Sequence, residues 1–145
     1  MPLSPSSSRP VFDILRGWPR GGAVEDVFTP TGSVELEEGD LIEVLSTGLV
    51  NKVTLASGDT KLVYIVVEGN KSSDSYSGNY LGKVVAITGD YKVITTKYAS
   101  GSYLPGLPVT VIGGKFSLLV KGEPIVGFVN AYDSVAGTLT VTVVN

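Results

Sequence analysis

The 145-residue chain contains no cysteine and no histidine. Without cysteine, it forms no disulfides, thiolate zinc sites or iron–sulfur clusters, and it has no cysteine nucleophile. Without histidine, it has no Ser-His-Asp triad and no histidine-ligated metal. These two absences disfavour an ordinary hydrolase or redox enzyme. We therefore expect a protein that holds no cofactor and no metal.

Long apolar runs are missing as well. One of the longest, residues 125–129, is far too short to cross a bilayer. The first ten residues carry prolines and serines and lack the apolar segment of a secretory signal. We therefore expect a protein that is made and used without export and that binds no membrane.

Positive charge is concentrated at the N-terminal end. The chain's three arginines and its single tryptophan all lie there: Arg9, Arg16, Trp18 and Arg20. Residues 1–24 carry a side-chain charge of +2, and residues 25–145 carry −5. Because an acidic surface is repelled by a phosphate backbone, we do not expect nucleic-acid binding.

From residue 31 onward, the sequence has the pattern of short β-strands. Turn signals rich in Gly, Asp, Asn and Ser recur at intervals of about 8–12 residues, which is typical of β-sandwiches and barrels. Between them lie β-branched runs, and the predicted strands are residues 41–44, 50–55, 62–67, 83–88, 92–96, 109–112, 116–119, 125–129 and 138–144. The last run alternates, with Leu139, Val141 and Val143 on one face, which predicts a half-buried strand.

No window longer than ten residues keeps a helical period without an interrupting glycine or proline. The predicted fold class is therefore all-β. We expect residues 31–145 to form a single compact β-barrel or β-tulip/sandwich of short antiparallel strands. Residues 39–44 and 89–94 both read Gly-Asp followed by a strand, and we interpret this match as turn chemistry and not as a repeat.

Residues 1–30 are predicted to form an extended N-terminal arm. Prolines push the residues before them toward extended backbone, and Gly17 and Pro19 stop the one possible helical turn. The arm nevertheless carries Arg, Trp and large apolar side chains, which dominate protein–protein contacts. The candidate partner-binding residues are Arg9, Phe12, Ile14, Leu15, Arg16, Trp18 and Arg20. Three outcomes stay open: docking on another subunit, folding back over an edge of its own sheet, or plain disorder.

The only candidates for paired-carboxylate chemistry are acidic residues close together in sequence: Glu35, Glu37, Glu38, Asp40 and Glu43. Such chemistry needs two carboxylates on opposite sides of one bond. Glu35 and Glu37 are expected to share one strand face as solvated neighbours. An exposed acidic rim is therefore the favoured interpretation.

Two segments and the order of the chain carry a family resemblance. The segments are Glu38-Gly39-Asp40-Leu41-Ile42-Glu43-Val44, at the opening of the body, and the late strand Gly122-Glu123-Pro124-Ile125-Val126-Gly127-Phe128-Val129. With the succession of short Val/Ile/Thr strands and the arm that precedes them, the chain resembles the capsid decoration proteins of tailed bacteriophages, also called cement or head-stabilising proteins. The Arg and Trp cluster of the arm is not part of the resemblance.

The resemblance implies a non-enzymatic virion protein, made in the host cytoplasm and located on the outer capsid surface. Its implied partner is the major capsid protein, and it implies a homo-oligomer, with a trimer favoured over a dimer. The alternative is another virion β-module, of a head fibre, tail or baseplate, that binds host glycans. Its sugar-stacking platforms are expected among the tyrosines Tyr76, Tyr80, Tyr91, Tyr98 and Tyr103.

Overall fold

The computed structural model describes residues 12–14, 24–32, 34–70 and 82–144. Over these residues the chain forms eleven strands: β1 (Phe12–Ile14), β2 (Val24–Phe28), β3 (Leu41–Val44), β4 (Val50–Lys52), β5 (Tyr64–Glu68), β6 (Val84–Thr88), β7 (Tyr91–Thr95), β8 (Pro108–Ile112), β9 (Lys115–Leu118), β10 (Gly127–Asp133) and β11 (Thr138–Val143). The all-β prediction is confirmed. The described residues contain no helix long and apolar enough to span a membrane.

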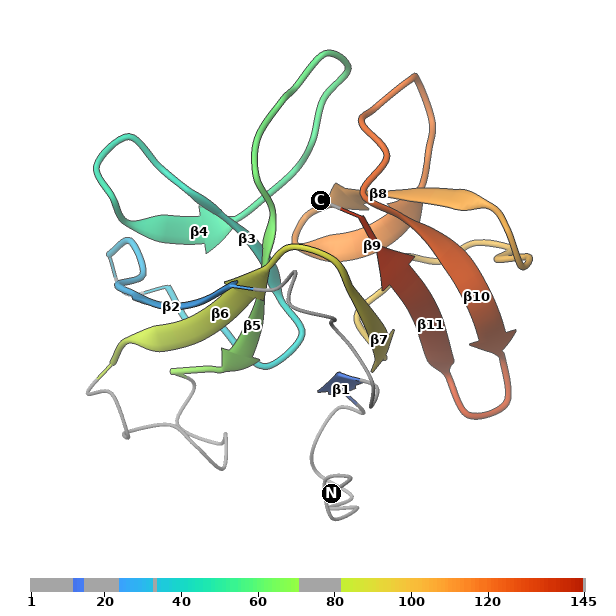
Figure 1. Cartoon of the computed structure of the whole chain (residues 1–145), viewed down its shortest axis with the longest axis horizontal. Coiled ribbons are helices and arrows are strands. Elements are labelled where there is room, and N and C mark those ends of the chain that lie inside the picture. The colour runs from blue at the N-terminus through green and yellow to red at the C-terminus, as the bar shows by residue number, and fades with distance from the viewer. Residues whose placement is uncertain (1–11, 15–23, 33, 71–81, 145) are drawn as a thin grey trace.

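The strands form two antiparallel sheets that lie side by side (Figure 1). One has five strands in the order β2-β6-β5-β3-β4, and the other has six in the order β1-β7-β11-β10-β8-β9. Each sheet curls so that its two edges approach each other. Pro30, just after β2, forms one bridge with Val50 of β4, and Tyr98, just after β7, forms one bridge with Phe116 of β9. Because each of these is one bridge and not a ladder, the sheets are not closed barrels. The sandwich-like form of the prediction therefore holds, and the closed barrel does not.

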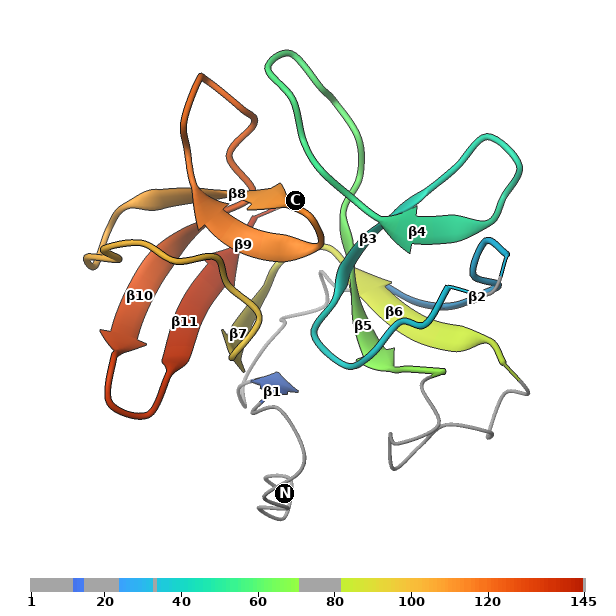
Figure 2. The ribbon, with the colours of Figure 1, turned by 180° about the vertical axis from the view of Figure 1, so that it is seen from behind.

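The two sheets repeat one topology. Strands β2 to β6 and strands β7 to β11 each follow the order first, fifth, fourth, second, third, and β1 is added at the edge of the second set. Both sets have an irregularity in their fourth strand, between Val66 and Glu68 and between Val129 and Ala131. We call β2 to β6 the first unit and β7 to β11 the second unit; Figure 2 shows them from behind.

The ladder register makes the correspondence exact to the residue. Val66 pairs with Ala86 in the first unit, as Val129 pairs with Val141 in the second. The equivalent positions are buried in both units: Ile42 and Val109, Val50 and Phe116, Val66 and Val129, Val84 and Leu139, Ala86 and Val141. The Gly-Asp stretches at 39–40 and 89–90 precede non-equivalent strands, β3 and β7, so they play no part in this duplication.

Two apolar clusters organise the core. The smaller lies inside the first unit and consists of Leu36, Ile42, Val50, Val66, Val84 and Ala86. The larger combines the interior of the second unit with the outer face of the first unit's sheet. Leu41 and Ile42 are neighbours in β3 yet belong to different clusters, because consecutive strand residues point to opposite faces. The strands β3, β5 and β6 of the first unit's sheet thus carry buried residues on both faces, and β6 is buried at every position.

All the strands predicted in residues 31–145 form, with differences only at their ends. β11 alternates as predicted, since Leu139, Val141 and Val143 are buried and Thr140 and Thr142 are half-buried. The described part of residues 31–145 forms nine strands, β3 to β11, one for each of the nine predicted runs. The additional strands, β1 and β2, lie in residues 1–30.

Two described segments of the predicted arm are strands of the chain's own sheets. β2 pairs with β6 over five residue pairs, and β1 pairs with β7 over three. β2 escaped prediction because four of its five residues are exposed, so it lacks the alternation of a half-buried strand. Over its described residues, the segment before residue 30 therefore contributes an edge strand to each sheet.

Candidate functional site

Two of the seven candidate partner-binding residues lie in a described strand. Phe12 and Ile14 belong to β1, where they pair with Thr95 and Val93 of β7. The other five lie outside the described residues: Arg9, Leu15, Arg16, Trp18 and Arg20. The structure therefore places the β1 backbone at the edge of the six-stranded sheet.

The exposed edge of the first unit is a surface that the sequence did not indicate. β2 is the edge strand of its sheet, and its side chains from Val24 to Val27 face solvent. Edge strands offer a row of backbone groups to a further strand, and proteins protect such edges or use them for binding. Exposed Val24 and Val27 make this edge apolar, whereas Glu25 and Asp26 keep it negatively charged.

The acidic residues before β3 form a tight turn and not a strand. The Asp40 N–H donates to the Glu37 carbonyl (3.1 Å), and the Glu37 N–H donates to Asp40 Oδ2 (2.8 Å). Glu38 and Asp40 are buried, Glu37 and Glu43 are half-buried, and Glu35 is exposed. The prediction of an exposed acidic rim is therefore wrong for Glu38 and Asp40, and Glu35 and Glu37 do not share a strand face.

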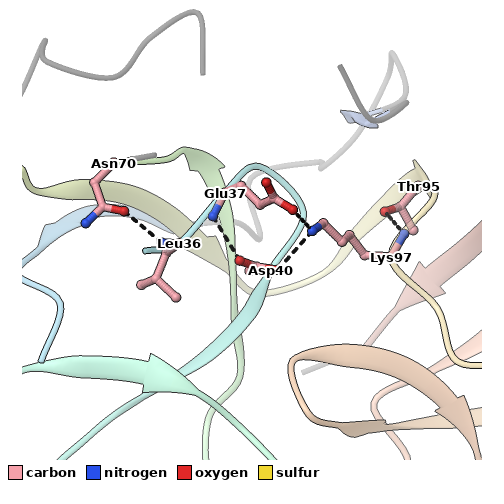
Figure 3. A network of polar contacts seen from close by, with 6 residues as sticks. All are labelled: Leu36, Glu37, Asp40, Asn70, Thr95 and Lys97. Carbon is pink, nitrogen blue, oxygen red and sulfur yellow. Dashed lines mark hydrogen bonds and ion pairs between the residues drawn. The ribbon is translucent and has the colours of Figure 1, made fainter. Parts of the chain in front are cut away.

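A lysine of the second unit reaches this turn of the first unit (Figure 3). Lys97, just after β7, pairs through Nζ with the carboxylate of Glu37 and lies 3.5 Å from Asp40 Oδ1. Its backbone N–H donates to Thr95 Oγ1 (3.0 Å), which fixes the start of the side chain. The carboxylates of Glu37 and Asp40 thus bind the two units to each other.

An asparagine supports the other side of the turn. Asn70 Oδ1 accepts the N–H of Leu36 (2.7 Å), and its Nδ2 donates to the carbonyl of Val34 (3.1 Å). These contacts hold the segment that places Leu36 in the first unit's core. The acidic turn is therefore fixed from both sides (Figure 3).

Three tyrosines form a cluster in the second unit. The rings of Tyr98, Tyr103 and Tyr132 lie with their centroids 5.5 Å apart in each pair, in edge or tilted orientations favoured by aromatic quadrupoles. The Tyr103 hydroxyl donates to the Ala99 carbonyl (2.6 Å). Burial, with the neighbouring Tyr132 and Tyr98, raises the pKa of Tyr103 to about 12. A hydrogen bond with Tyr132 raises the pKa of Tyr98.

The tyrosines expected to stack on sugars are only partly accessible. Tyr91 and Tyr103 are buried, so neither presents a ring face to solvent. Tyr98 is half-buried within the cluster, and Tyr76 and Tyr80 lie outside the described residues. The prediction of stacking platforms is therefore wrong for Tyr91 and Tyr103.

Tyr91 differs from Tyr103 in its hydroxyl. Within the described part of the chain, the buried Tyr91 hydroxyl has no hydrogen-bond partner. Burial raises the pKa of Tyr91 well above its ordinary value. The Tyr103 hydroxyl thus has a hydrogen-bond partner, whereas the Tyr91 hydroxyl has none among the described residues.

Comparisons of this chain with protein-family models, with curated proteins and with solved structures gave no match. Within the described ranges, no group of three or more acidic side chains lies together as metal ligands do. A functional assignment therefore depends on the sequence pattern and on the geometry of the edges, the acidic turn and the tyrosine cluster.

The two buried tyrosines give a matched pair of substitutions. Tyr103→Phe removes the hydrogen bond to Ala99 and is expected to lower the free energy of unfolding by about 1 kcal/mol. Tyr91→Phe removes an unpaired buried hydroxyl and is expected to leave stability unchanged or to raise it. Urea denaturation at neutral pH measures both, and equal losses would contradict the hydrogen-bond assignment.

The raised pKa of Tyr103 predicts that the folded protein loses stability at alkaline pH. The folded-state pKa of Tyr103 is raised, so the unfolded chain loses this proton first. The contribution of the protonated Tyr103 to the free energy of unfolding is complete below pH 10 and disappears as the pH rises through about 12. Tyr103→Phe is therefore expected to make the fall in stability over this range shallower.

Lys97→Met tests the tie between the units. It keeps the apolar stem but leaves the buried Asp40 without this cation, and we expect a loss of about 1–3 kcal/mol in the free energy of unfolding. Lys61→Met is the control, because Lys61 pairs with Glu43 at 3.2 Å near the surface and is expected to cost under about 1 kcal/mol. Similar small losses in both variants would show that Lys97 does not tie the units.

Proposed function

We propose that this protein is a non-enzymatic structural component of a bacteriophage virion that binds the outer surface of the capsid and stabilises contacts between major capsid protein subunits. The observation that carries the proposal is the position of the segment before residue 30. Its described strands, β1 and β2, each lie at the edge of a sheet, and the β2 side chains from Val24 to Val27 face solvent. The Arg and Trp residues singled out from the sequence lie before and between these two strands.

The rigidity of the described body supports this function. The two units share one apolar cluster and are tied by Lys97, Glu37 and Asp40. A body of this kind transmits force between the capsid subunits that it contacts. Because a decoration protein gains its contacts only on the assembled shell, each copy favours the assembled state, and many copies add their modest affinities.

The pairing of β2 reduces the cost of binding through this segment. Ordering a free backbone costs about 1–2 kcal/mol per residue. β2 is already held by β6 over five residue pairs, so its residues are ordered before any partner binds. The edge that carries Val24 and Val27 is thus preorganised for contact.

The alternative of a glycan-binding virion module has less support. Tyr91 and Tyr103 would have to leave the core to stack on a sugar ring. Tyr98 and Tyr132 are already engaged with each other and with Tyr103. We therefore retain glycan binding only as an outcome of the test.

Full-length variants test the capsid function by co-sedimentation with shells of the major capsid protein encoded by the same phage. Trp18→Ala and the double variant Arg16→Ala/Arg20→Ala are expected to bind at least about tenfold more weakly than wild type, because Trp and Arg dominate protein contacts. Val135→Ala is the apolar control, since Val135 lies in the β10–β11 turn and is 97% exposed. Lys115→Ala is the charge control.

Three outcomes would count against the proposal. Unchanged binding by both test variants would remove the assigned role of Arg16, Trp18 and Arg20. A wild-type protein that never sediments with the shells would contradict the capsid function itself. Specific binding on a glycan array, with no binding to shells, would establish the alternative.

A further inference from the structure

The two units are joined by a contact that runs in one direction. The tip of the β8–β9 hairpin of the second unit is hydrogen-bonded to the start of β3 and to the residues just after β4 in the first unit. Three backbone hydrogen bonds of 2.9 Å fix it: Leu41 N–H to the Gly114 carbonyl, Gly114 N–H to the Val53 carbonyl, and Leu55 N–H to the Val111 carbonyl. The second unit thus supplies a hairpin, and the first unit supplies a receiving face.

The receiving face of the first unit is apolar and covered. Ile87, Ile65 and Leu41 lie in one row across β6, β5 and β3. Their exposed fractions are 8%, 0% and 1%, and all three belong to the cluster shared with the second unit. Val111, at the tip of the incoming hairpin, belongs to the same cluster and is fully buried.

The second unit has the equivalent face, and there it is open. By the register of the ladders, the row of Ile87, Ile65 and Leu41 corresponds to Thr142, Phe128 and Pro108. Phe128 is 41% exposed, although the equivalent Ile65 is fully buried. Thr142 and Pro108 are half-buried. The row of the first unit is therefore buried throughout, whereas this row is open to solvent at Phe128.

The first unit has the equivalent hairpin, and its tip is free. Val44 pairs with Val50 as Val111 pairs with Phe116, so Val44 takes the place of Val111. Val44 is 41% exposed, whereas Val111 is fully buried. The β3–β4 hairpin, whose turn is one residue longer than the β8–β9 turn, and the Phe128 face are therefore the exposed counterparts of the two parts of the internal contact.

We propose that the β3–β4 hairpin of one copy docks on the Phe128 face of a second copy, and so repeats between molecules the contact that joins the two units within each. The partner of this surface is a second copy of the chain. The contact is head-to-tail, so repeated docking yields a closed ring or an open filament. This inference does not depend on the proposed capsid function.

The Phe128 face of the second unit offers fewer free backbone N–H donors than the equivalent face of the first unit. Pro108 replaces Leu41 and has no N–H to donate. Lys121, which follows β9 by three residues as Leu55 follows β4, already donates its N–H to Glu123 Oε1 (2.9 Å). The contact between copies is therefore more apolar and weaker than the contact within a copy. The fraction of molecules that associate accordingly depends on protein concentration.

Two exposed positions provide a complementation test, read by the molar mass in solution without any capsid. Phe128→Asp blocks the face, and Val44→Asp blocks the hairpin. Wild type is expected to form species larger than one 15.1 kDa chain as concentration rises. Each variant alone is expected to stay monomeric, with association at least about tenfold weaker than wild type. Val135→Asp, at a turn outside the contact, is expected to associate as wild type does.

A mixture of the Phe128→Asp and Val44→Asp variants tests whether the contact between copies is head-to-tail. Phe128→Asp still carries an intact hairpin and Val44→Asp an intact face, so the mixture is expected to form a one-to-one heterodimer and nothing larger. A mixture that stays monomeric while wild type associates would overturn the head-to-tail contact. A monomeric wild type at every concentration would overturn it as well, as would oligomers that survive in both single variants. If Phe128→Asp weakens only shell binding, the face belongs to another partner and the proposal is wrong.

Discussion

The burial of the first unit's outer sheet face against the second unit is the contact on which the rest of the structure depends. Leu41, Ile65 and Ile87 lie on that face and share one apolar cluster with the interior of the second unit. Because the opposite face covers the first unit's own core, the strands β3, β5 and β6 carry buried residues on both sides. The backbone hydrogen bonds from Gly114 and the ion pairs of Lys97 lie beside this contact and fix the relative position of the units.

The strands of the body could be predicted from sequence, because turn residues and β-branched runs are local signals. β3 matches its prediction to the residue, and β11 shows the expected alternation. β2 could not be predicted, since its exposed residues carry no alternation and its pairing with β6 joins segments about sixty residues apart. The duplication was equally hidden. Equivalent core positions share only their apolar character, as Val50 and Phe116 do, and this leaves no detectable sequence repeat.

The candidate sites, too, could be predicted from sequence only in part. The sequence identified the acidic cluster, but only the structure shows that Asp40 is buried and that Lys97, 57 residues later, reaches it. That ion pair gives Glu37 and Asp40 a structural role in joining the two units. The duplication also gives meaning to exposed Phe128, which alone is an unremarkable surface residue. Its buried counterpart, Ile65, shows what kind of contact that position makes.

Native-state hydrogen exchange tests the contact between the units most directly. If the two units are one cooperative body, the amides of Leu55 and Gly114 at the contact exchange only through global unfolding, with the same free energy of opening as the Val66 amide in the first unit. Exchange of Leu55 and Gly114 at a clearly lower free energy, with Val66 still protected, would mean that the units separate while each stays folded. That result would contradict the account.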